Sequence, residues 1–446
     1  MSVSFLSELA ARRRFGMKPG LGTITALCRA LGDPQRQFKA IHVAGTNGKG
    51  AVCAILDAVL GARKDGLIGR YTSPHLVRIN ERFFLDGVPV DDATLERLAR
   101  KVHETAEAVG SGVDSLTFFE ALTAIAFLLY AENRVVHAVL ECGLGGRLDA
   151  TNVCEPELCV ITRIGLDHCD WLGDTVEKIA GEKAGIIKRG VPIVLARNEP
   201  SVVSVIRAAA RANDAPFHYA PDLASEADIP ADFSLLGAFN RENAVTAIAA
   251  LKVLFSRASS TSVTSLLPSA SLSHVVWPGR FQRVGAFLVD GAHNPPAARA
   301  LADSLARFPG LSERSRALDL VFGACGDKDV VDVLRILSPF VRRAYAVRTN
   351  NPRSLAAEDL AMRMRAVGLE AEPCASLTEA LARARASGGF GETSAPAALV
   401  CGSLFLAGEA LVALNAYPWP SARFDPSELL SPPAVGIDLK GNVLCK

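Results

Sequence analysis

The chain has 446 residues, of which 49% are hydrophobic and 21% charged, a balance typical of globular proteins and not of disordered or collagen-like chains. Its 48 basic and 47 acidic residues give a net charge of +1, which excludes a strongly basic surface for nucleic acid or for an anionic membrane. This length predicts two to three domains.

No segment approaches the roughly 18 consecutive apolar residues that cross a bilayer. The start of the chain, MSVSFLSELAARRRF, lacks the basic-then-apolar order of a signal peptide. We therefore expect a cytoplasmic protein with no membrane and no nucleic acid among its partners. The ten cysteines are scattered without a C-x-x-C pair, which favours reduced thiols over a disulfide framework.

The first two thirds of the chain alternate strand-like and helix-like segments. Short apolar runs typical of buried strands lie at 41–44, 135–140, 159–164 and 193–196. Apolar residues with helical spacing lie at 51–63, 92–109, 117–131, 175–184 and 202–212. Because strands that alternate with helices form parallel sheets covered on both faces, we predict an α/β domain with a mostly parallel sheet over 1–277.

The alternation stops and then resumes. A stretch rich in Ser, Thr and Ala at 256–273 is expected to be a surface loop, followed by a hinge over 278–285. Later strand candidates lie at 286–290, 318–323, 343–347 and 398–401, and helix candidates at 329–337, 356–366, 377–386 and 404–414. These predict a second, smaller α/β domain over 286–417, followed by a Pro-rich extended tail over 418–446.

The sharpest local motif is AGTNGKGA at 44–51, between an apolar strand and an amphipathic helix. Glycines let successive backbone N–H groups face one anion, the helix N-terminus adds positive charge, and Lys49 can reach the outer phosphates. The motif differs from the common Walker pattern, because two residues separate its first glycines and Gly50 follows the lysine. The alternative is a tight glycine turn with an exposed lysine, which explains the strand and helix flanks less well.

Further motifs follow this loop in a fixed order along nearly the whole chain. They are TSPHLVRINER at 72–82, TFFEALTA at 117–124, LECGLGGRLDATN at 140–152, LDH at 166–168, GEKAGIIK at 181–188, RENAVTA at 241–247, WPGRF at 277–281, DGAHNP at 290–295, DKD at 327–329, NPR at 351–353 and CGSLFLAGEA at 401–410. With them the chain resembles the folylpolyglutamate synthase/dihydrofolate synthase family of the Mur-ligase-like superfamily. The resemblance implies a P-loop ATPase-like N-terminal domain, a smaller Rossmann-like C-terminal domain, and a site between them.

The resemblance also implies a reaction, in which ATP drives the joining of a carboxylate to the amino group of L-glutamate. The carboxylate would belong to tetrahydrofolate or to dihydropteroate. A carboxylate oxygen is a poor leaving group until the γ-phosphate of ATP converts it to an acyl phosphate, which the amine can attack. The protein would mainly position three substrates and neutralise phosphate charge. The small-molecule partners would be ATP, L-glutamate and the folate, with Mg²⁺ as cofactor, and the protein is expected to be a monomer.

Three residues are magnesium-ligand candidates by the same resemblance, namely Ser73, Glu141 and His168. Oxygen ligands suit Mg²⁺, and Glu141 ends an apolar strand, where a carboxylate would face the crevice of a parallel sheet. A turn serine, a strand-end charge and a loop histidine are the simpler alternatives. Lys49, Glu141 and His168 are expected to be catalytic together with Lys183, whose carbamylation is implied by resemblance alone. From the sequence alone Lys183 would be a helix-surface lysine.

The candidate ATP-binding residues are Gly45, Thr46, Asn47, Gly48, Lys49, Gly50, Ala51, Asn243, Arg280, Asp290 and His293. Arg280 lies in the expected hinge, so that domain closure could bring its guanidinium to the γ-phosphate. An interdomain salt bridge is the alternative for Arg280. Asn243 is expected to start a helix, where capping is the simpler role.

The candidate substrate-binding residues are Pro19, Gly20, Leu21, Thr117, Phe118, Phe119, Glu120, Leu148, Asp149 and Ala150. Phe119 is the residue expected to stack on the flat pterin ring, a contact that contributes roughly 0.5–1.5 kcal/mol beyond burial. The alternative is that Phe118 and Phe119 belong to a helix core.

The sequence departs from the family pattern at two places. Ala51 stands where the family usually has Ser or Thr, and the lost hydrogen bond costs on the order of 1–3 kcal/mol. Phe239 and Asn240 replace the usual His-Gln pair, which makes contacts to adenine less secure than contacts to phosphate. Two other functions remain open: a Mur-type ligase acting on a nucleotide-sugar peptide, and a degenerate nucleotide-binding module without turnover. Only about 40 residues precede the loop strand, too few for the extra N-terminal domain of a Mur-type enzyme.

Overall fold

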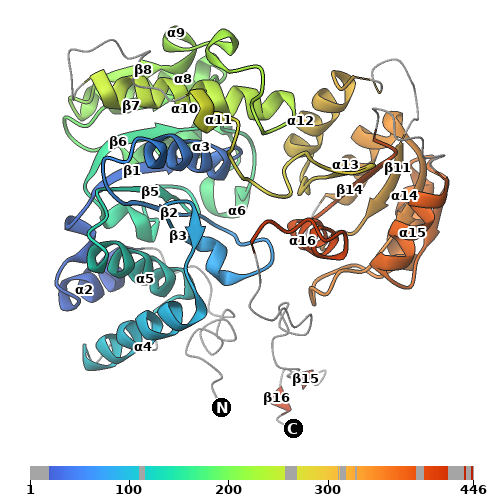
Figure 1. The fold of residues 1–446 in the computed structure, drawn as a ribbon, viewed down its shortest axis with the longest axis horizontal. Coiled ribbons are helices and arrows are strands. Elements are labelled where there is room, and N and C mark those ends of the chain that lie inside the picture. The colour runs from blue at the N-terminus through green and yellow to red at the C-terminus, as the bar shows by residue number, and fades with distance from the viewer. Residues whose placement is uncertain are drawn as a thin grey trace.

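The computed structural model describes residues 20–109, 116–256, 269–309, 311, 318–326, 329–387 and 396–419, together with two short strands at 436–437 and 443–444. The described chain forms two α/β lobes that lie side by side, the first blue to green and the second yellow to red (Figure 1). Residue 19, the 327–328 part of DKD, most of the expected 256–273 loop and nearly all of the expected tail lie outside the described residues.

An eight-stranded sheet forms the centre of the first lobe, in the order β4-β3-β2-β5-β1-β6-β7-β8. Its strands are β1 Lys39–Ala44, β2 Ile68–Tyr71, β3 Phe83–Leu85, β4 Val88–Pro89, β5 His137–Glu141, β6 Pro156–Ile161, β7 Ile193–Leu195 and β8 Phe217–Tyr219. Strands β2, β5, β1, β6, β7 and β8 pair in parallel, and only the β2–β3 and β3–β4 pairs are antiparallel. The predicted mostly parallel sheet is confirmed.

Helices cover both faces of this sheet. They are α2 Gly22–Ala30, α3 Lys49–Ala62, α4 Asp92–Ala108, α5 Phe118–Glu132, α6 Cys169–Leu172, α7 Val176–Lys183, α8 Pro200–Ala212, α9 Ala220–Leu223, α10 Ala238–Ser256 and α11 Ser269–Leu272. Side chains alternate across a strand, so Ala40 packs with α4 and α5 while Ile41 and Val43 pack with α3 and α10. Short 3₁₀ turns lie at Pro34–Arg36, Ile79–Arg82, Ala150–Val153, Ala184–Ile186 and Glu226–Asp228.

The second lobe is a six-stranded sheet in the order β13-β12-β11-β14-β10-β9, parallel except for the β9–β10 pair. Its strands are β9 Gln282–Val284, β10 Phe287–Val289, β11 Leu318–Phe322, β12 Val341–Ala346, β13 Ala371–Pro373 and β14 Ala398–Cys401. Its helices are α12 Pro295–Ala306, α13 Val330–Leu337, α14 Ala357–Ala366, α15 Leu377–Ser387 and α16 Leu404–Ala413, with a 3₁₀ turn at Ser338–Phe340. Strands β15 Gly436–Ile437 and β16 Val443–Leu444 pair with each other.

The predicted elements of both lobes are present, with ends displaced by a few residues. Sequence patterns missed α2, α12, the short helices α6, α9 and α11, and the short strands at or near the sheet edges, and they placed the start of α10 too late, at Asn243. Helix α10 has apolar residues on nearly every side because it is packed between α3 and α9, so it lacks a clear amphipathic period. The cysteines of the described residues are free thiols, and all except Cys169 are buried. Within the same residues, no helix combines the length and the hydropathy that a bilayer crossing requires.

Candidate active site

The glycine-rich loop connects β1 to α3 at the carboxyl end of the first sheet. Gly45 and Gly48 have φ values of 150° and 88°, which favour glycine, and Gly48 is the N-cap of α3. Space also requires glycine, because a Cβ on Gly45 would lie 1.8 Å from the Thr162 Oγ1 atom and one on Gly48 would lie 2.2 Å from the Asn243 Oδ1 atom. The first N–H groups of α3 have no partner within the helix and are therefore donors for an anion.

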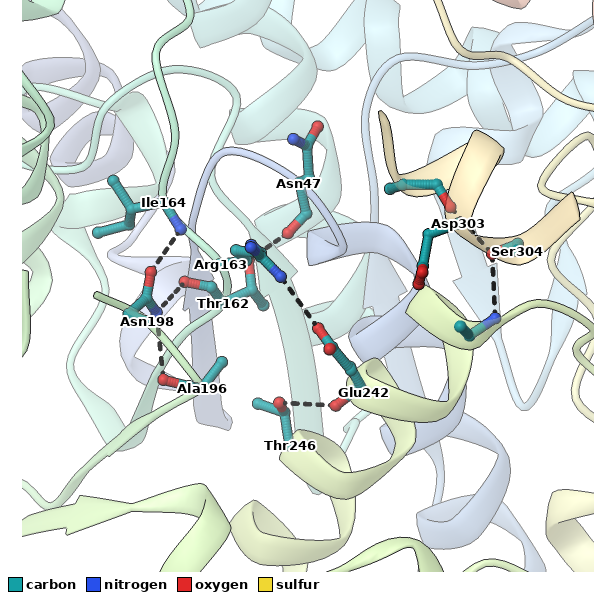
Figure 2. A network of polar contacts seen from close by, with 12 residues as sticks. Asn47, Thr162, Arg163, Ile164, Ala196, Asn198, Glu242, Thr246, Asp303 and Ser304 are labelled. Carbon is teal, nitrogen blue, oxygen red and sulfur yellow. Dashed lines mark hydrogen bonds and ion pairs between the residues drawn. The ribbon is translucent and has the colours of Figure 1, made fainter. Parts of the chain in front are cut away.

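Neighbouring elements brace this loop from outside. The N–H groups of Thr46 and Asn47 donate to the Arg163 carbonyl at 3.0 and 3.2 Å, and Thr162 Oγ1 donates to the Asn47 carbonyl at 2.7 Å. The Arg163 side chain pairs with Glu242 on α10 at 3.4 Å. Figure 2 shows Thr162 reaching the loop at Asn47, and Glu242 of α10 reaching the side chain of the neighbouring Arg163. Residues 162 and 163, which follow β6, therefore hold the backbone of the phosphate loop at residues 46 and 47.

Lys49 and Glu141 lie on neighbouring elements at this end of the sheet. Glu141 ends β5, the strand beside β1, and its Oε2 atom accepts a hydrogen bond from the Ser73 N–H at 2.9 Å. Burial raises the pKa of the Glu141 carboxyl, and the charge of Lys49, the Ser73 N–H and the charge of Arg280 oppose this rise. The Lys49 Nζ atom donates to the Thr46 carbonyl at 3.3 Å. The structure thus joins Ser73 to Glu141 by a hydrogen bond, and it places the charges of Lys49 and Arg280 where they act on the Glu141 pKa.

The residues at this position fit a divalent metal in part. A buried carboxylate beside a serine offers the hard oxygen donors that Mg²⁺ prefers. His168 is the exposed N-cap of α6, with φ of 51°, and its own N–H donates to Asp167 at 3.0 Å. Among the described residues, no group of three or more His, Cys, Asp or Glu side chains is placed to hold a metal ion. Glu141 with Ser73 is therefore the pair that fits the metal, and the role of His168 stays a prediction.

Lys183 is buried and does not lie on the surface that its sequence pattern favours. It ends α7, and its Nζ atom donates to the Gly45 carbonyl at 2.9 Å. Burial and the nearby charge of Lys49 lower the pKa of its amine to about 7. A large fraction of the amine is therefore neutral near neutral pH, as a nucleophilic lysine requires.

The second lobe contributes Arg280, Asp290 and His293. The two Asp290 carboxylate oxygens accept from the Phe281 N–H at 2.8 Å and the Ala292 N–H at 2.7 Å, so this carboxylate clamps the turn that carries Arg280. The His293 ring donates through Nδ1 to the Gly291 carbonyl at 2.8 Å. Both Asp290 oxygens are therefore used within the turns of the second lobe, and a part for Asp290 and His293 in ATP binding stays a prediction.

Two contacts correct or extend the sequence analysis. Asn243 does not start a helix, because α10 begins five residues earlier at Ala238, and its side chain instead lies against Gly48. Asn294, the N-cap of α12, donates to Asp167 across the lobes at 3.2 Å. Asn294, Asp167 and Thr162 are not among the predicted site residues, although the first two lie inside the DGAHNP and LDH motifs.

The predicted substrate residues lie on α5 and on the segment after β5. Thr117 and Glu120 form a capping box at the start of α5, in which each side chain accepts from the other residue's N–H. The half-buried Phe119 ring lies on Gly143, where a Cβ would be 2.6 Å from its Cζ atom, and 6.0 Å from the Tyr71 ring. Phe119 therefore borders the segment that leads to the 148–150 residues.

The 148–150 turn is held by its own carboxylate. Asp149 is buried and accepts from the Leu144 N–H at 2.8 Å and from the Thr151 N–H and hydroxyl. Burial raises the pKa of the Asp149 carboxyl. Leu148 is exposed beside it, and Ala150 is buried. The Arg82 Cζ atom lies 5.9 Å from the centroid of the Phe118 ring. Leu21 packs on the apolar core that contains α5, and Gly20 is exposed.

Comparisons with known proteins agree with this architecture. Residues 92–251 match the Mur ligase middle domain, and residues 279–403 match the Mur ligase, glutamate ligase domain. The dihydrofolate synthase/folylpolyglutamate synthase of Bacillus subtilis is 36% identical over 379 residues, covering 79% of this chain and 86% of that protein. The chain belongs to the folylpolyglutamate synthase/dihydrofolate synthase family.

Solved structures of this family share the whole two-lobed fold. The Mycobacterium tuberculosis folylpolyglutamate synthase complexed with ADP has a TM-score of 0.81 and 31% identity, covering 92% of this chain and 98% of that one. Escherichia coli FolC in complex with DHPP and ADP has a TM-score of 0.78 and 28% identity, covering 92% of this chain and 97% of that one. The predicted family and fold class are therefore confirmed.

Proposed function

We propose that this chain is an ATP-dependent ligase that forms an amide between L-glutamate and the carboxylate of a folate. The observation that carries the proposal is the meeting of the phosphate loop, Glu141 and the hinge residue Arg280 at one end of the first sheet, in a chain whose relatives are named for this reaction. Tetrahydrofolate is the proposed acceptor, and dihydropteroate is the second acceptor to test.

The reaction has two steps. The folate carboxylate attacks the γ-phosphorus of ATP, so that ADP leaves and an acyl phosphate forms. The amine of L-glutamate then attacks the acyl carbon, and phosphate leaves with the former carboxylate oxygen while the amine loses a proton. The protein contributes position and charge, because neither step needs a covalent bond to a side chain.

Each candidate residue has a proposed part in these steps. The N–H groups at the start of α3 and the Lys49 ammonium would hold the β- and γ-phosphates, and Arg280 would neutralise charge on the transferred group. Glu141 and Ser73 would hold Mg²⁺, with His168 as the proposed third ligand. That ion would neutralise phosphate charge. Asn243, Asp290 and His293 would also contact ATP, Asn243 from its place beside Gly48 of the phosphate loop.

Lys183 is proposed to be carbamylated. Its lowered pKa leaves a neutral amine that can add to CO₂, and the product is an anion of carboxylate type. The pterin is proposed to lie between Phe119 and the 148–150 turn, where an aromatic face and a buried carboxylate are close together.

The test is turnover by the purified full chain with ATP, Mg²⁺, L-glutamate and one acceptor at a time. We expect glutamate-dependent release of phosphate with tetrahydrofolate and a product heavier by one glutamate residue. With ¹⁸O in the acceptor carboxylate, label must reach inorganic phosphate. Amide formation without transfer of label would contradict the acyl phosphate.

The same assay separates the other functions. Turnover with a UDP-sugar peptide and with no folate would assign a Mur-type ligase. ATP binding without turnover on any acceptor would assign a degenerate nucleotide-binding module. We also propose a monomeric enzyme, because both lobes that form the site come from one chain, and the cytoplasmic location stays a prediction.

A further inference from the structure

The Trp277 side chain occupies an unusual position against the phosphate loop. It precedes the second lobe, yet its ring packs with the core of the first lobe that contains α3 and α10. A Cβ on Gly50, in the first turn of α3, would lie 2.1 Å from the Trp277 Cζ2 atom and 2.6 Å from its Cη2 atom. The indole therefore lies directly on the backbone of the residue that follows Lys49.

Two guanidinium groups lie near the same ring. The Arg280 Cζ atom is 5.9 Å from the Trp277 ring centroid, and the Arg70 Cζ atom is 5.8 Å from it. Both distances fall within the range of cation–π attraction. Arg70 is buried, pairs with Asp57 of α3 at 3.2 Å, and lies 3.8 Å from the Phe84 ring centroid. The Trp277 ring thus lies beside one guanidinium, that of Arg70, which burial and its ion pair with Asp57 hold in place.

The two residues that flank Arg280, Gly279 and Phe281, restrict its backbone. Gly279 and Phe281 both have left-handed backbone, with φ of 67° and 52°. Gly279 accepts from the Gly291 N–H at 2.9 Å, and Phe281 is fully buried in the core of the second lobe. Arg280 therefore sits between one anchor in each lobe, on the segment that crosses from one lobe to the other after α11 (Figure 1).

We propose that Trp277 is a positioning residue that sets the place of the Arg280 guanidinium relative to the phosphate loop. The Trp277 ring packs on Gly50 and attracts Arg280. The first turn of α3 and the Arg280 guanidinium, which would both contact the outer phosphates, are therefore positioned by the same side chain. The proposal rests on the proposed function for its catalytic readout, but its binding readout needs only a nucleotide.

A purely structural role for Trp277 makes a different prediction. If the ring only filled the core, its replacement would lower the unfolding temperature and leave the properties of the folded fraction unchanged. If the ring positions Arg280, its replacement weakens binding of the γ-phosphate and lowers kcat, while the affinity for ADP stays the same. The two roles are therefore separated by comparing nucleotides on the same folded sample.

The experiment uses Trp277→Leu, Trp277→Phe and Arg280→Met in the full chain. Calorimetric titration with ADP and with AMPPNP gives the ratio of their dissociation constants for each protein. We expect Trp277→Leu and Arg280→Met to reduce the preference for AMPPNP to a similar extent, and Trp277→Phe to keep most of it. An unchanged ratio in Trp277→Leu would overturn the proposal, as would equal losses for ADP and AMPPNP.

The catalytic arm adds a second readout. We expect Trp277→Leu to lower kcat by on the order of a hundredfold, as for a group misplaced by about 1 Å, with little change in the KM for glutamate. A wild-type protein without turnover would contradict the proposed function and leave the binding arm to decide this inference. If Trp277→Leu does not fold, Trp277→Met, which keeps an apolar side chain on Gly50 but offers Arg280 no aromatic face, must reduce the same ratio.

Discussion

Burial and neighbouring charges shift the pKa values of single residues in this site. Glu141 is a buried carboxylate with its pKa raised by burial, and the charges of Lys49 and Arg280 partly offset that rise. Lys183 is a buried amine with its pKa lowered by burial and by Lys49. Such shifted values are typical of functional sites, because an ordinary surface carboxylate or amine would have little shift.

For Glu141 we predict that Glu141→Gln abolishes most turnover. The amide can still accept from the Ser73 N–H, so the loop position is kept while the negative charge for a metal is lost. We expect kcat to fall by roughly 10²–10³-fold, the scale seen when one electrostatic group is removed from an active site. Steady-state kinetics over a range of Mg²⁺ concentrations measures this. Glu132→Gln, at a surface pair with Arg97 and Lys101, is the matched control, and similar losses in both variants would contradict the prediction.

For Lys183 we predict a carbamate whose formation increases with pH through about 7, because only the neutral amine adds to CO₂. Incubation with ¹³C-bicarbonate should give a carbamate NMR signal that Lys183→Gln lacks and that the surface variant Lys178→Gln retains. In the unmodified protein the unfolded lysine binds more protons than the folded one between about pH 7 and its usual value of 10.5, so stability should rise with pH in that window. Absence of a Lys183-dependent signal at pH 8 would refute this prediction.

At the scale of elements, the phosphate loop is shaped by its neighbours as well as by its own glycines. Asn243 of α10 lies against Gly48, Thr162 after β6 lies against Gly45, and Trp277 lies against Gly50. The motif GTNGKG predicts an anion-binding turn before a helix. It does not predict which distant side chains fill the space beside each glycine, because this depends on how β6, α10 and the hinge pack around β1.

We predict that Gly48→Ala weakens nucleotide binding by at least about tenfold. A side chain there would need a positive φ, which costs on the order of 1–2 kcal/mol, and would collide with the Asn243 side chain. The control is Gly61→Ala in the same helix, where nothing lies within 4 Å of an added Cβ. That variant should raise the unfolding free energy by about 0.5–1 kcal/mol and leave ADP affinity unchanged. Calorimetric titration measures the ADP affinity, and urea unfolding measures the unfolding free energy. Equal ADP affinities in Gly48→Ala and Gly61→Ala would refute the prediction for Gly48.

At the scale of the whole molecule, a loop of the first lobe is packed into the core of the second. Leu76 and Val77, which follow the candidate metal residue Ser73, belong to the apolar cluster of α15, α16 and their sheet. The Glu81 carboxylate accepts from the N–H groups of residues 76–78 and also from the Tyr417 hydroxyl at 2.7 Å. The position of Ser73 is therefore coupled to the second lobe.

We predict that Tyr417→Phe loosens this coupling. Removing a hydroxyl that donates to a buried carboxylate costs roughly 1–3 kcal/mol of unfolding free energy, and the loop that carries Ser73 becomes less well held. We expect kcat to fall several-fold and the Mg²⁺ concentration for half-maximal activity to rise. Tyr219→Phe, on β8 at the far edge of the first sheet, is the control for loss of a tyrosine hydroxyl. A stability loss without any change in the Mg²⁺ dependence would contradict the coupling.

Local sequence patterns by themselves determined the two α/β lobes, the phosphate loop and the strand end that carries Glu141. Apolar periodicity, glycine spacing and strand–helix order are properties of short segments. They therefore predict local structure without knowledge of the tertiary contacts. Only the tertiary structure decided that Lys183 is buried against Gly45, that Asn243 lies inside α10 against Gly48, and that Trp277 rests on Gly50. Those contacts join residues that are far apart in the chain. Burial shifts the pKa of a side chain, and close packing leaves no space for a Cβ at these glycines, so both effects arise only after the sheets and helices have packed.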